Sequence, residues 1–224
     1  MLALFDQGPV TFELSNPASK AKQSVRMSRA VFGERLRLML YSLGSTARVP
    51  LVIHRAARGD WAPFAASSPS GAIPAVSGMY LTITCSENAA RITEEDIVRE
   101  SRDTFLGEDR TRRHLRACQE WPRAEIPQGY YEPVVSETPV LILSGELDGV
   151  TPPSLAAAAA RTLPQSRQIL MRNEAHGYWN DCTQNLMAQF VTKASARDLD
   201  VSCVQKLRRP PFVTEIAPPD ERLK

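Results

Sequence analysis

The chain has 224 residues, of which 43% are apolar and 23% charged, and its formal net charge is +2. This length suits one sizeable domain, and the balance is typical of a soluble globular protein. The small net charge argues against a nucleic-acid partner, and no apolar run approaches the ~20 residues of a membrane-spanning helix.

The first third of the chain is predicted to be irregular and then helical. Residues 1–20 contain several Gly and Pro residues and are expected to lack regular structure. Apolar residues at helical spacing predict a long helix over 20–43 and a second helix over 50–58. The Ser, Pro and Gly residues of 67–71 indicate a linker.

The middle third is expected to hold one strand and two helices. Residues 79–84, M-Y-L-T-I-T, alternate and include β-branched side chains, which predicts a strand. Thr93 and the acidic residues after it are typical of a helix N-terminus, so a helix is expected over 93–105. A further helix is expected over 110–120, and its His114 is interpreted as exposed and inert. His54, in the earlier helix, is interpreted as structural and not catalytic.

The last third carries the pattern of a parallel α/β sheet. Residues 140–144 form a short apolar run that is typical of a buried strand, and 166–172 predict another strand. The Ala-rich stretch 155–163 between them predicts a helix that begins after two prolines. A final helix is expected over 182–194, with Leu186, Met187, Phe190 and Val191 on one side.

An acid and an imidazole follow these two strands. Asp148 comes just past the first strand, and His176 lies in the loop after the second, 28 positions later. Neighbouring parallel strands end at the same edge of a sheet, where α/β proteins place their working residues. A carboxylate that orients an imidazole is the acid–base pair of a catalytic triad.

The residues around this pair resemble a known family. G-E-L-D-G-V-T-P-P at 145–153 and A-H-G at 175–177 resemble the C-terminal end of an α/β-hydrolase of the tripeptidyl aminopeptidase and proline iminopeptidase group. The resemblance implies an α/β fold, namely a partial α/β-hydrolase. Residues 1–135 would form a helical lid region with one core strand near 79–84, and residues 136–205 the C-terminal segment of the hydrolase. The prolines that follow indicate that residues 206–224 form an extended, loosely held tail.

The resemblance also implies roles for single residues. Asp148 would be the triad acid and His176 the triad base, acting on a small peptide or ester without a metal or cofactor. Family members commonly read Cys-x-Glu-Asp where this chain has Cys85-Ser86-Glu87-Asn88, so Glu87 is a candidate for holding the substrate's ammonium group. Asn88 departs from the family pattern.

The nucleophile of such an enzyme is missing from the sequence. No serine lies in a G-x-S-x-G elbow, and no G-x-G-x-x-G indicates a dinucleotide site. We therefore expect a C-terminal fragment of a serine exopeptidase, inactive alone, whose partner is the missing N-terminal segment. The alternatives are a non-catalytic module or pseudo-enzyme that binds a partner, or an esterase of the same fold.

The four cysteines bear on the compartment. Their spacing matches no zinc motif. The family resemblance implies the bridges Cys85–Cys118 and Cys182–Cys203, and four free thiols are the alternative. Disulfides persist in oxidising compartments, so the full-length protein is expected to be secreted or periplasmic, although the N-terminus of this chain shows no signal peptide.

Overall fold

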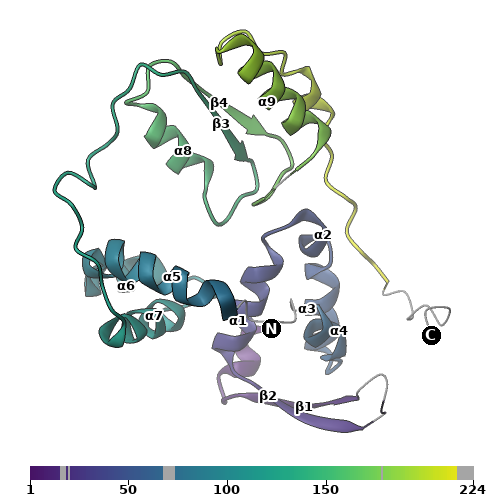
Figure 1. The fold of residues 1–224 in the computed structure, drawn as a ribbon. Helices are drawn as coiled ribbons and strands as arrows, with labels where there is room; N and C mark the ends of the chain where they lie inside the picture. Colours follow the sequence, from purple (N-terminus) through teal and green to yellow (C-terminus); the bar gives the residue numbers. More distant parts are fainter. Residues whose placement is uncertain (16–18, 20, 68–73, 178, 216–224) are drawn as a thin grey trace. The chain divides into compact units, whose positions relative to one another are not determined.

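A computed structural model describes residues 1–15, 19, 21–67, 74–177 and 179–215. The chain forms two compact units (Figure 1): the first comprises Met1–Leu38 and Val52–Tyr131, and the second comprises Met39–Leu51 and Glu132–Lys224. Most of the predicted linker at 67–71 and the end of the predicted tail, 216–224, lie outside the described residues.

The described elements alternate between helices and short strands. In chain order they are η1 (Leu2–Phe5), β1 (Val10–Ser15), β2 (Lys22–Met27), α1 (Arg29–Met39), α2 (Leu43–Thr46), α3 (Val49–Ala57), α4 (Ala62–Ala66), α5 (Pro74–Glu87), η2 (Ala89–Arg91), α6 (Glu94–Ser101), α7 (Asp109–Glu120), β3 (Val140–Gly145), α8 (Pro153–Ala160), β4 (Ser166–Met171), α9 (Asp181–Lys193) and η3 (Ser202–Lys206).

The first unit begins with an antiparallel hairpin, β1 paired with β2. The predictions of irregular chain over 1–20 and of a helix from residue 20 are therefore wrong. In β2 the less exposed residues are Val25 and Met27, at the two-residue period of a strand, and Met27 is buried. Helix α1 begins only after Ser28, whose hydroxyl accepts a hydrogen bond from the Val31 N–H.

Aromatic side chains form the core beside this hairpin. The Phe32 and Phe64 rings stack with centroids 4.7 Å apart, and both residues are fully buried. Phe5 and Phe12 pack against Trp61, at 6.1 Å and 5.2 Å between centroids. Such contacts between large rings stabilise a core beyond the area that they bury. Helix α3 agrees with the prediction over 50–58.

Residues 79–84 belong to helix α5, so the predicted core strand is wrong. The residues of this region that pack in the core are Leu81, Cys85 and Ala89, and their spacing of four is that of one helix face. The hydroxyls of Thr82 and Thr84 donate to carbonyl oxygens one helical turn back. These bonds satisfy the polar side chains that gave the stretch its alternating pattern.

Helices α6 and α7 agree with the sequence, except that α6 is shorter than predicted. Thr93 caps α6, because its hydroxyl accepts from the Asp96 N–H while the Asp96 carboxylate accepts from the Thr93 N–H. The helix ends at Ser101, and Asp103 takes a left-handed conformation with φ of 59°. Four residues of the predicted 93–105 span therefore follow the helix as a turn.

The second unit is built on a parallel β3–α8–β4 unit, as predicted. The two strands pair from Val140 opposite Ser166 to Gly145 opposite Met171. Helices α8 and α9 lie on opposite faces of this two-stranded sheet (Figure 1). The face toward α9 carries the core, which consists of Leu141, Leu143, Ile169, Met171, Cys182, Leu186, Phe190, Leu199, Val201, Cys203, Val204 and Leu207.

The apolar side of α9 is narrower than predicted, and the tail is more firmly held. Leu186 is fully buried, but Met187 is 41% and Val191 77% exposed. Leu207 packs on the core, and the Val213 N–H donates to the Ala47 carbonyl at 2.9 Å. The predicted extended tail thus has anchored residues within its described part.

Both implied disulfides are present, and each lies within one unit. Cys85 is bonded to Cys118 in the first unit, and Cys182 is bonded to Cys203 in the second. The first bridge joins α5 to α7, and the second joins α9 to η3. No helix among the described residues is both long enough and apolar enough to cross a membrane.

We expect the double substitution Cys182→Ala and Cys203→Ala to lower the free energy of unfolding of the second unit by about 3 kcal/mol. The bridge spans 21 positions and restricts the unfolded chain over that loop. Hydrogen exchange read by mass spectrometry should show faster exchange in β3, β4 and α9. Cys85→Ala with Cys118→Ala is the matched control, because its effect should stay in the first unit. Unchanged protection of β4 in the first variant would contradict the expectation.

Candidate active site

Asp148 lies in the turn that follows β3 and is held there by main-chain donors. Its Oδ1 accepts from the N–H groups of Val150 and Thr151, at 2.8 and 2.9 Å. The Asp148 N–H in turn donates to the Gly145 carbonyl at 3.2 Å. Only 8% of the residue is exposed, so these bonds replace the water that a carboxylate would otherwise bind.

The loops after β3 and β4 are joined to each other. The Leu147 N–H donates to the Glu174 carbonyl at 2.8 Å, and the Asn173 N–H donates to a Glu146 carboxylate oxygen at 2.8 Å. A Cβ atom at Gly145 would lie 2.2 Å from the Ala175 carbonyl oxygen, far inside contact distance. Glycine at 145 is therefore what lets the two loops approach so closely.

This approach brings the predicted acid and base together. His176 Nδ1 lies 3.0 Å from Asp148 Oδ2. Burial raises the pKa of Asp148, but hydrogen bonds from Thr151, Val150 and His176 outweigh it and lower that pKa to about 2. Because an ionised carboxylate only accepts hydrogen bonds, Nδ1 carries the proton and Nε2 keeps its lone pair. The imidazole is thus in the tautomer that a general base needs.

Two further side chains contact this pair, and sequence reasoning missed both. Thr151 Oγ1 donates to Asp148 Oδ2 at 2.7 Å and lies 3.3 Å from His176 Nδ1. The Tyr41 ring meets the His176 ring edge to face, with centroids 5.1 Å apart. A hydroxyl three residues after an acid is a signal that the sequence does contain. Tyr41 is 135 positions from His176, and nothing in the sequence connects them.

A second carboxyl group, that of Glu174, lies two positions before His176 in the sequence. Burial raises the pKa of Glu174, while a hydrogen bond from Asn180 Nδ2 at 2.8 Å opposes the rise. Asn180 also caps α9, because its Oδ1 accepts from the Thr183 N–H at 2.9 Å. The hydrogen bond between Asn180 and Glu174 therefore ties the chain just before His176 to the N-terminus of α9.

The described hydrogen bonds of His176 go to Asp148 and Thr151, and none of them involves a serine. Ser144, at the end of β3, is 5% exposed, and its hydroxyl accepts from Gln168 Nε2 at 3.1 Å. The second unit therefore presents an acid and a base, and the Ser144 hydroxyl is bonded to a side chain of the neighbouring strand β4.

Glu87 belongs to the first unit, whereas Asp148 and His176 belong to the second. The neighbouring Glu87 carboxylate raises the pKa of Tyr130, chiefly as a hydrogen-bond acceptor. The Tyr131 hydroxyl donates to the Glu87 main-chain carbonyl at 2.7 Å. The Glu87 carboxylate is thus a hydrogen-bond acceptor that lies beside a tyrosine hydroxyl.

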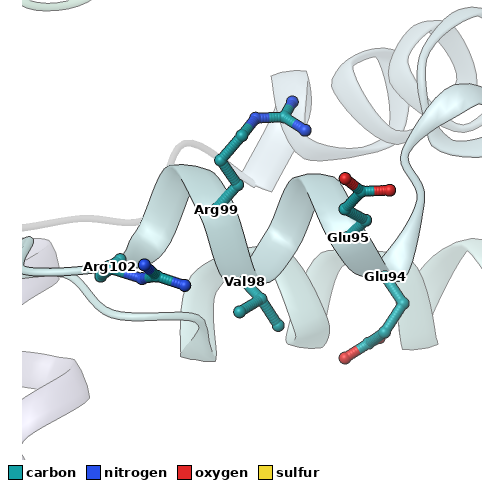
Figure 2. Close-up of a pocket in the computed structure, with 5 residues that line it drawn as sticks. All are labelled: Glu94, Glu95, Val98, Arg99 and Arg102. Atoms are coloured by element: carbon teal, nitrogen blue, oxygen red, sulfur yellow. The ribbon is translucent and has the colours of Figure 1, made fainter.

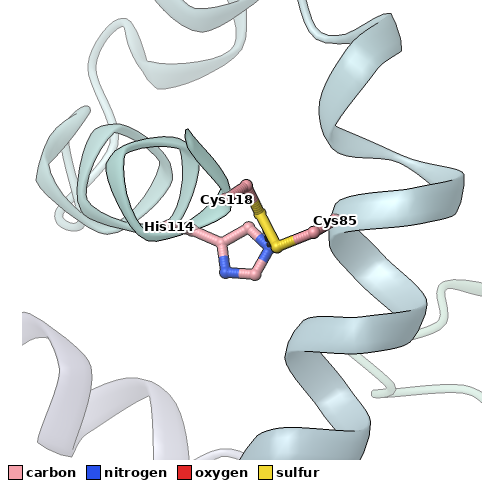
Figure 3. A group of neighbouring side chains, drawn as sticks. All are labelled: Cys85, His114 and Cys118. Atoms are coloured by element: carbon pink, nitrogen blue, oxygen red, sulfur yellow. Dashed lines mark hydrogen bonds between the residues drawn. A yellow bond between two sulfur atoms is a disulfide. The ribbon is translucent and has the colours of Figure 1, made fainter. Parts of the chain in front are cut away.

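One cluster in the described part of the chain has the residue types of a metal site. Cys85, His114 and Cys118 place their potential ligand atoms within 4.8 Å of one another (Figure 3). Both sulfurs are committed to the disulfide, so they are not thiolates that bind a metal. His114 lies half-buried 3.6 Å from the Cys118 sulfur, so the prediction that it is exposed is wrong.

A small pocket lies along α6 (Figure 2), and all of its lining residues come from that helix or its C-terminal end. Its lining consists of Glu94, Glu95, Val98, Arg99 and Arg102. Arg99 pairs with Asp96 and Glu100, and Glu94 pairs with Arg112. Because the charges of Arg99 and Glu94 are already compensated, we assign the pocket no chemistry.

The low pKa of Asp148 predicts how the stability of the second unit varies with pH. Its folded-state pKa lies below the ordinary 3.8, so the fold favours the ionised form. The resulting stability, about 2 kcal/mol, is complete above about pH 4 and is lost as the pH falls toward 2. We expect the difference in unfolding free energy between the parent and Asp148→Asn to shrink over that range in urea titrations. A difference that stayed constant down to about pH 2 would contradict this.

Of the comparisons with known proteins, one found a match. No curated protein and no solved structure matches the chain. A family model described as TAP-like protein matches residues 103–203, a stretch that includes α7, β3, α8, β4, Asp148 and His176. This match, together with the small parallel sheet, supports a TAP-like α/β-hydrolase domain over residues 103–203.

Proposed function

We propose that this chain supplies the acid and the base of a serine exopeptidase. The observation that carries the proposal is the 3.0 Å contact between His176 Nδ1 and the buried Asp148 carboxylate, within a domain of a hydrolase family. The substrate would be a small peptide, from whose N-terminus residues or short peptides are released. The reaction requires no cofactor.

In the proposed reaction His176 Nε2 takes the proton of a serine hydroxyl as the oxygen attacks the scissile carbonyl. The Asp148 carboxylate stabilises the imidazolium that forms, and its low pKa keeps it ionised throughout. His176 then gives the proton to the leaving amine. The hydroxyl would come from a segment with a G-x-S-x-G elbow, which this sequence lacks. The chain alone is therefore proposed to be inactive.

An alternative is a module that binds a partner and has no catalytic role. Among the described residues β3 pairs only with β4, so its second edge has no strand beside it. An unpaired edge of a parallel sheet is a place where another strand adds. The same edge would receive the proposed serine-bearing segment, so the two functions differ in whether hydrolysis results. An esterase would use the same residues.

The two disulfides support a location outside the reducing cytosol. We propose that the full-length protein is secreted or periplasmic, because both disulfides need an oxidising compartment to persist.

Mixing or co-expressing this chain with the N-terminal segment of a TAP-like hydrolase, including its G-x-S-x-G elbow, should restore cleavage of a peptidyl p-nitroanilide. In that mixture His176→Ala should abolish hydrolysis, and Asp148→Asn should reduce kcat on the order of 10⁴-fold. Each component alone should be inactive. Binding of the two segments without hydrolysis would favour the non-catalytic module. Hydrolysis by this chain alone that depends on His176 would contradict the proposal that the serine comes from another segment. Release from a p-nitrophenyl ester but not from an anilide would identify an esterase.

Glu87 is proposed to bind the ammonium group of the substrate. An ammonium would replace the Tyr130 hydroxyl as its partner and form a stronger, charge-assisted bond. In the restored enzyme Glu87→Gln should raise KM for a peptide with a free N-terminus about tenfold and leave an N-acetylated peptide unaffected. Glu95→Gln, an exposed acid in the same unit, is the control. Equal effects on both peptides would refute this role.

A further inference from the structure

The hydroxyl of Thr151 lies beside the contact between the acid and the base and touches both groups. It lies 2.7 Å from Asp148 Oδ2 and 3.3 Å from His176 Nδ1. Since the carboxylate has no proton, the hydroxyl must donate to it, and the hydroxyl oxygen is then left to accept from Nδ1–H. The imidazole proton therefore faces two acceptors, the carboxylate and the hydroxyl.

We propose that Thr151 is a positioning residue of the acid–base pair, which fixes both the carboxylate plane and the imidazole tautomer. This inference rests on the proposed hydrolase function. Thr151 touches neither substrate nor reacting atoms in this proposal, and it acts through Asp148 and His176.

The two oxygens of Asp148 are held in different ways. Main-chain N–H groups of Val150 and Thr151 bind Oδ1, and those donors survive any substitution of the Thr151 side chain by another non-proline residue. Oδ2, the oxygen that faces His176, has the Thr151 hydroxyl as its other described partner. Without that hydroxyl the carboxylate is able to turn about its remaining anchor, and the imidazole loses its second acceptor.

The backbone around Thr151 also favours this arrangement. Pro152 follows directly, and a residue before proline is restricted to extended conformations. Pro152 and Pro153 then lead into α8, so Thr151 is fixed between a tight turn and a helix start. A side chain on such a restricted backbone holds its hydroxyl in place at a small cost in entropy.

The test compares Thr151→Val, which keeps the shape and removes the hydroxyl, with Thr151→Ser, which keeps the hydroxyl. Thr162→Val is the matched control, because the Thr162 hydroxyl donates over the same 2.7 Å distance to the Val134 carbonyl in the same unit. The first readout is the pKa of Asp148, from ¹³C NMR of the side-chain carboxyl in chain 1–224, assigned with Asp148→Asn. The second is hydrolysis by this chain restored with the serine-bearing segment.

We expect Thr151→Val to raise the proton affinity of Asp148 about tenfold, because it removes a hydrogen bond to the charged form. In the restored enzyme kcat should fall about 10- to 100-fold with KM unchanged. Thr151→Ser should recover most of both losses, and Thr162→Val should match the parent.

An unchanged Asp148 titration in Thr151→Val would overturn the positioning role, whatever the activity. The positioning role would also be overturned if Thr151→Val and Thr162→Val had equal kcat in a mixture where His176→Ala is inactive. The hydrolase function would then stand, and only the role of Thr151 would fall. If the parent mixture fails to hydrolyse any substrate, the proposed function fails, and the carboxyl titration alone decides whether Thr151 holds the pair.

Discussion

The candidate site depends on one close backbone approach, between Gly145 at the end of β3 and the Ala175 carbonyl in the loop after β4. Any side chain at 145 would overlap that oxygen. With the loops in contact, the Leu147 N–H reaches the Glu174 carbonyl, and Asp148 and His176 follow within hydrogen-bonding distance. The candidate acid–base pair is thus positioned by main-chain geometry at the C-terminal ends of the two strands.

The electrostatics of the pair follow from this placement. A carboxylate that is 8% exposed would ordinarily hold its proton more tightly, since burial disfavours its charge. Two main-chain donors, a hydroxyl and an imidazole reverse that tendency and keep Asp148 ionised. An ionised acid has no proton to donate, so it fixes the proton on Nδ1 of His176. The tautomer of His176 is therefore a consequence of the hydrogen-bond donors in the turn after β3, which keep the Asp148 carboxylate ionised.

The sequence was most informative where one physical signal dominated. The apolar run before Ser144, the alanines of α8 and the Thr93 cap each led to the correct element, because burial, helix propensity and capping act locally. The positions of Asp148 and His176 after parallel strands followed from sheet topology, and the structure brings their side chains together.

The sequence was misleading where tertiary contacts decided the outcome. Residues 79–84 alternate like a strand, but the burial of Leu81 and Cys85 against α7 and the disulfide to Cys118 favour a helix. Residues 22–27 fall within the helix predicted over 20–43, whose apolar spacing comes mainly from later residues, yet they pair with β1. The contact of Tyr41 with His176 has no local signal at all, because it joins segments far apart in the chain.

The distribution of contacts within the second unit explains how an acid–base pair persists on so small a sheet. Two paired strands are marginally stable by themselves. Here α8 and α9 cover opposite faces, and the Cys182–Cys203 bridge ties η3 to α9 beside the same core. Every described partner of Asp148 and His176, Tyr41 included, lies within this unit. The described contacts that hold the pair are therefore all supplied by the second unit.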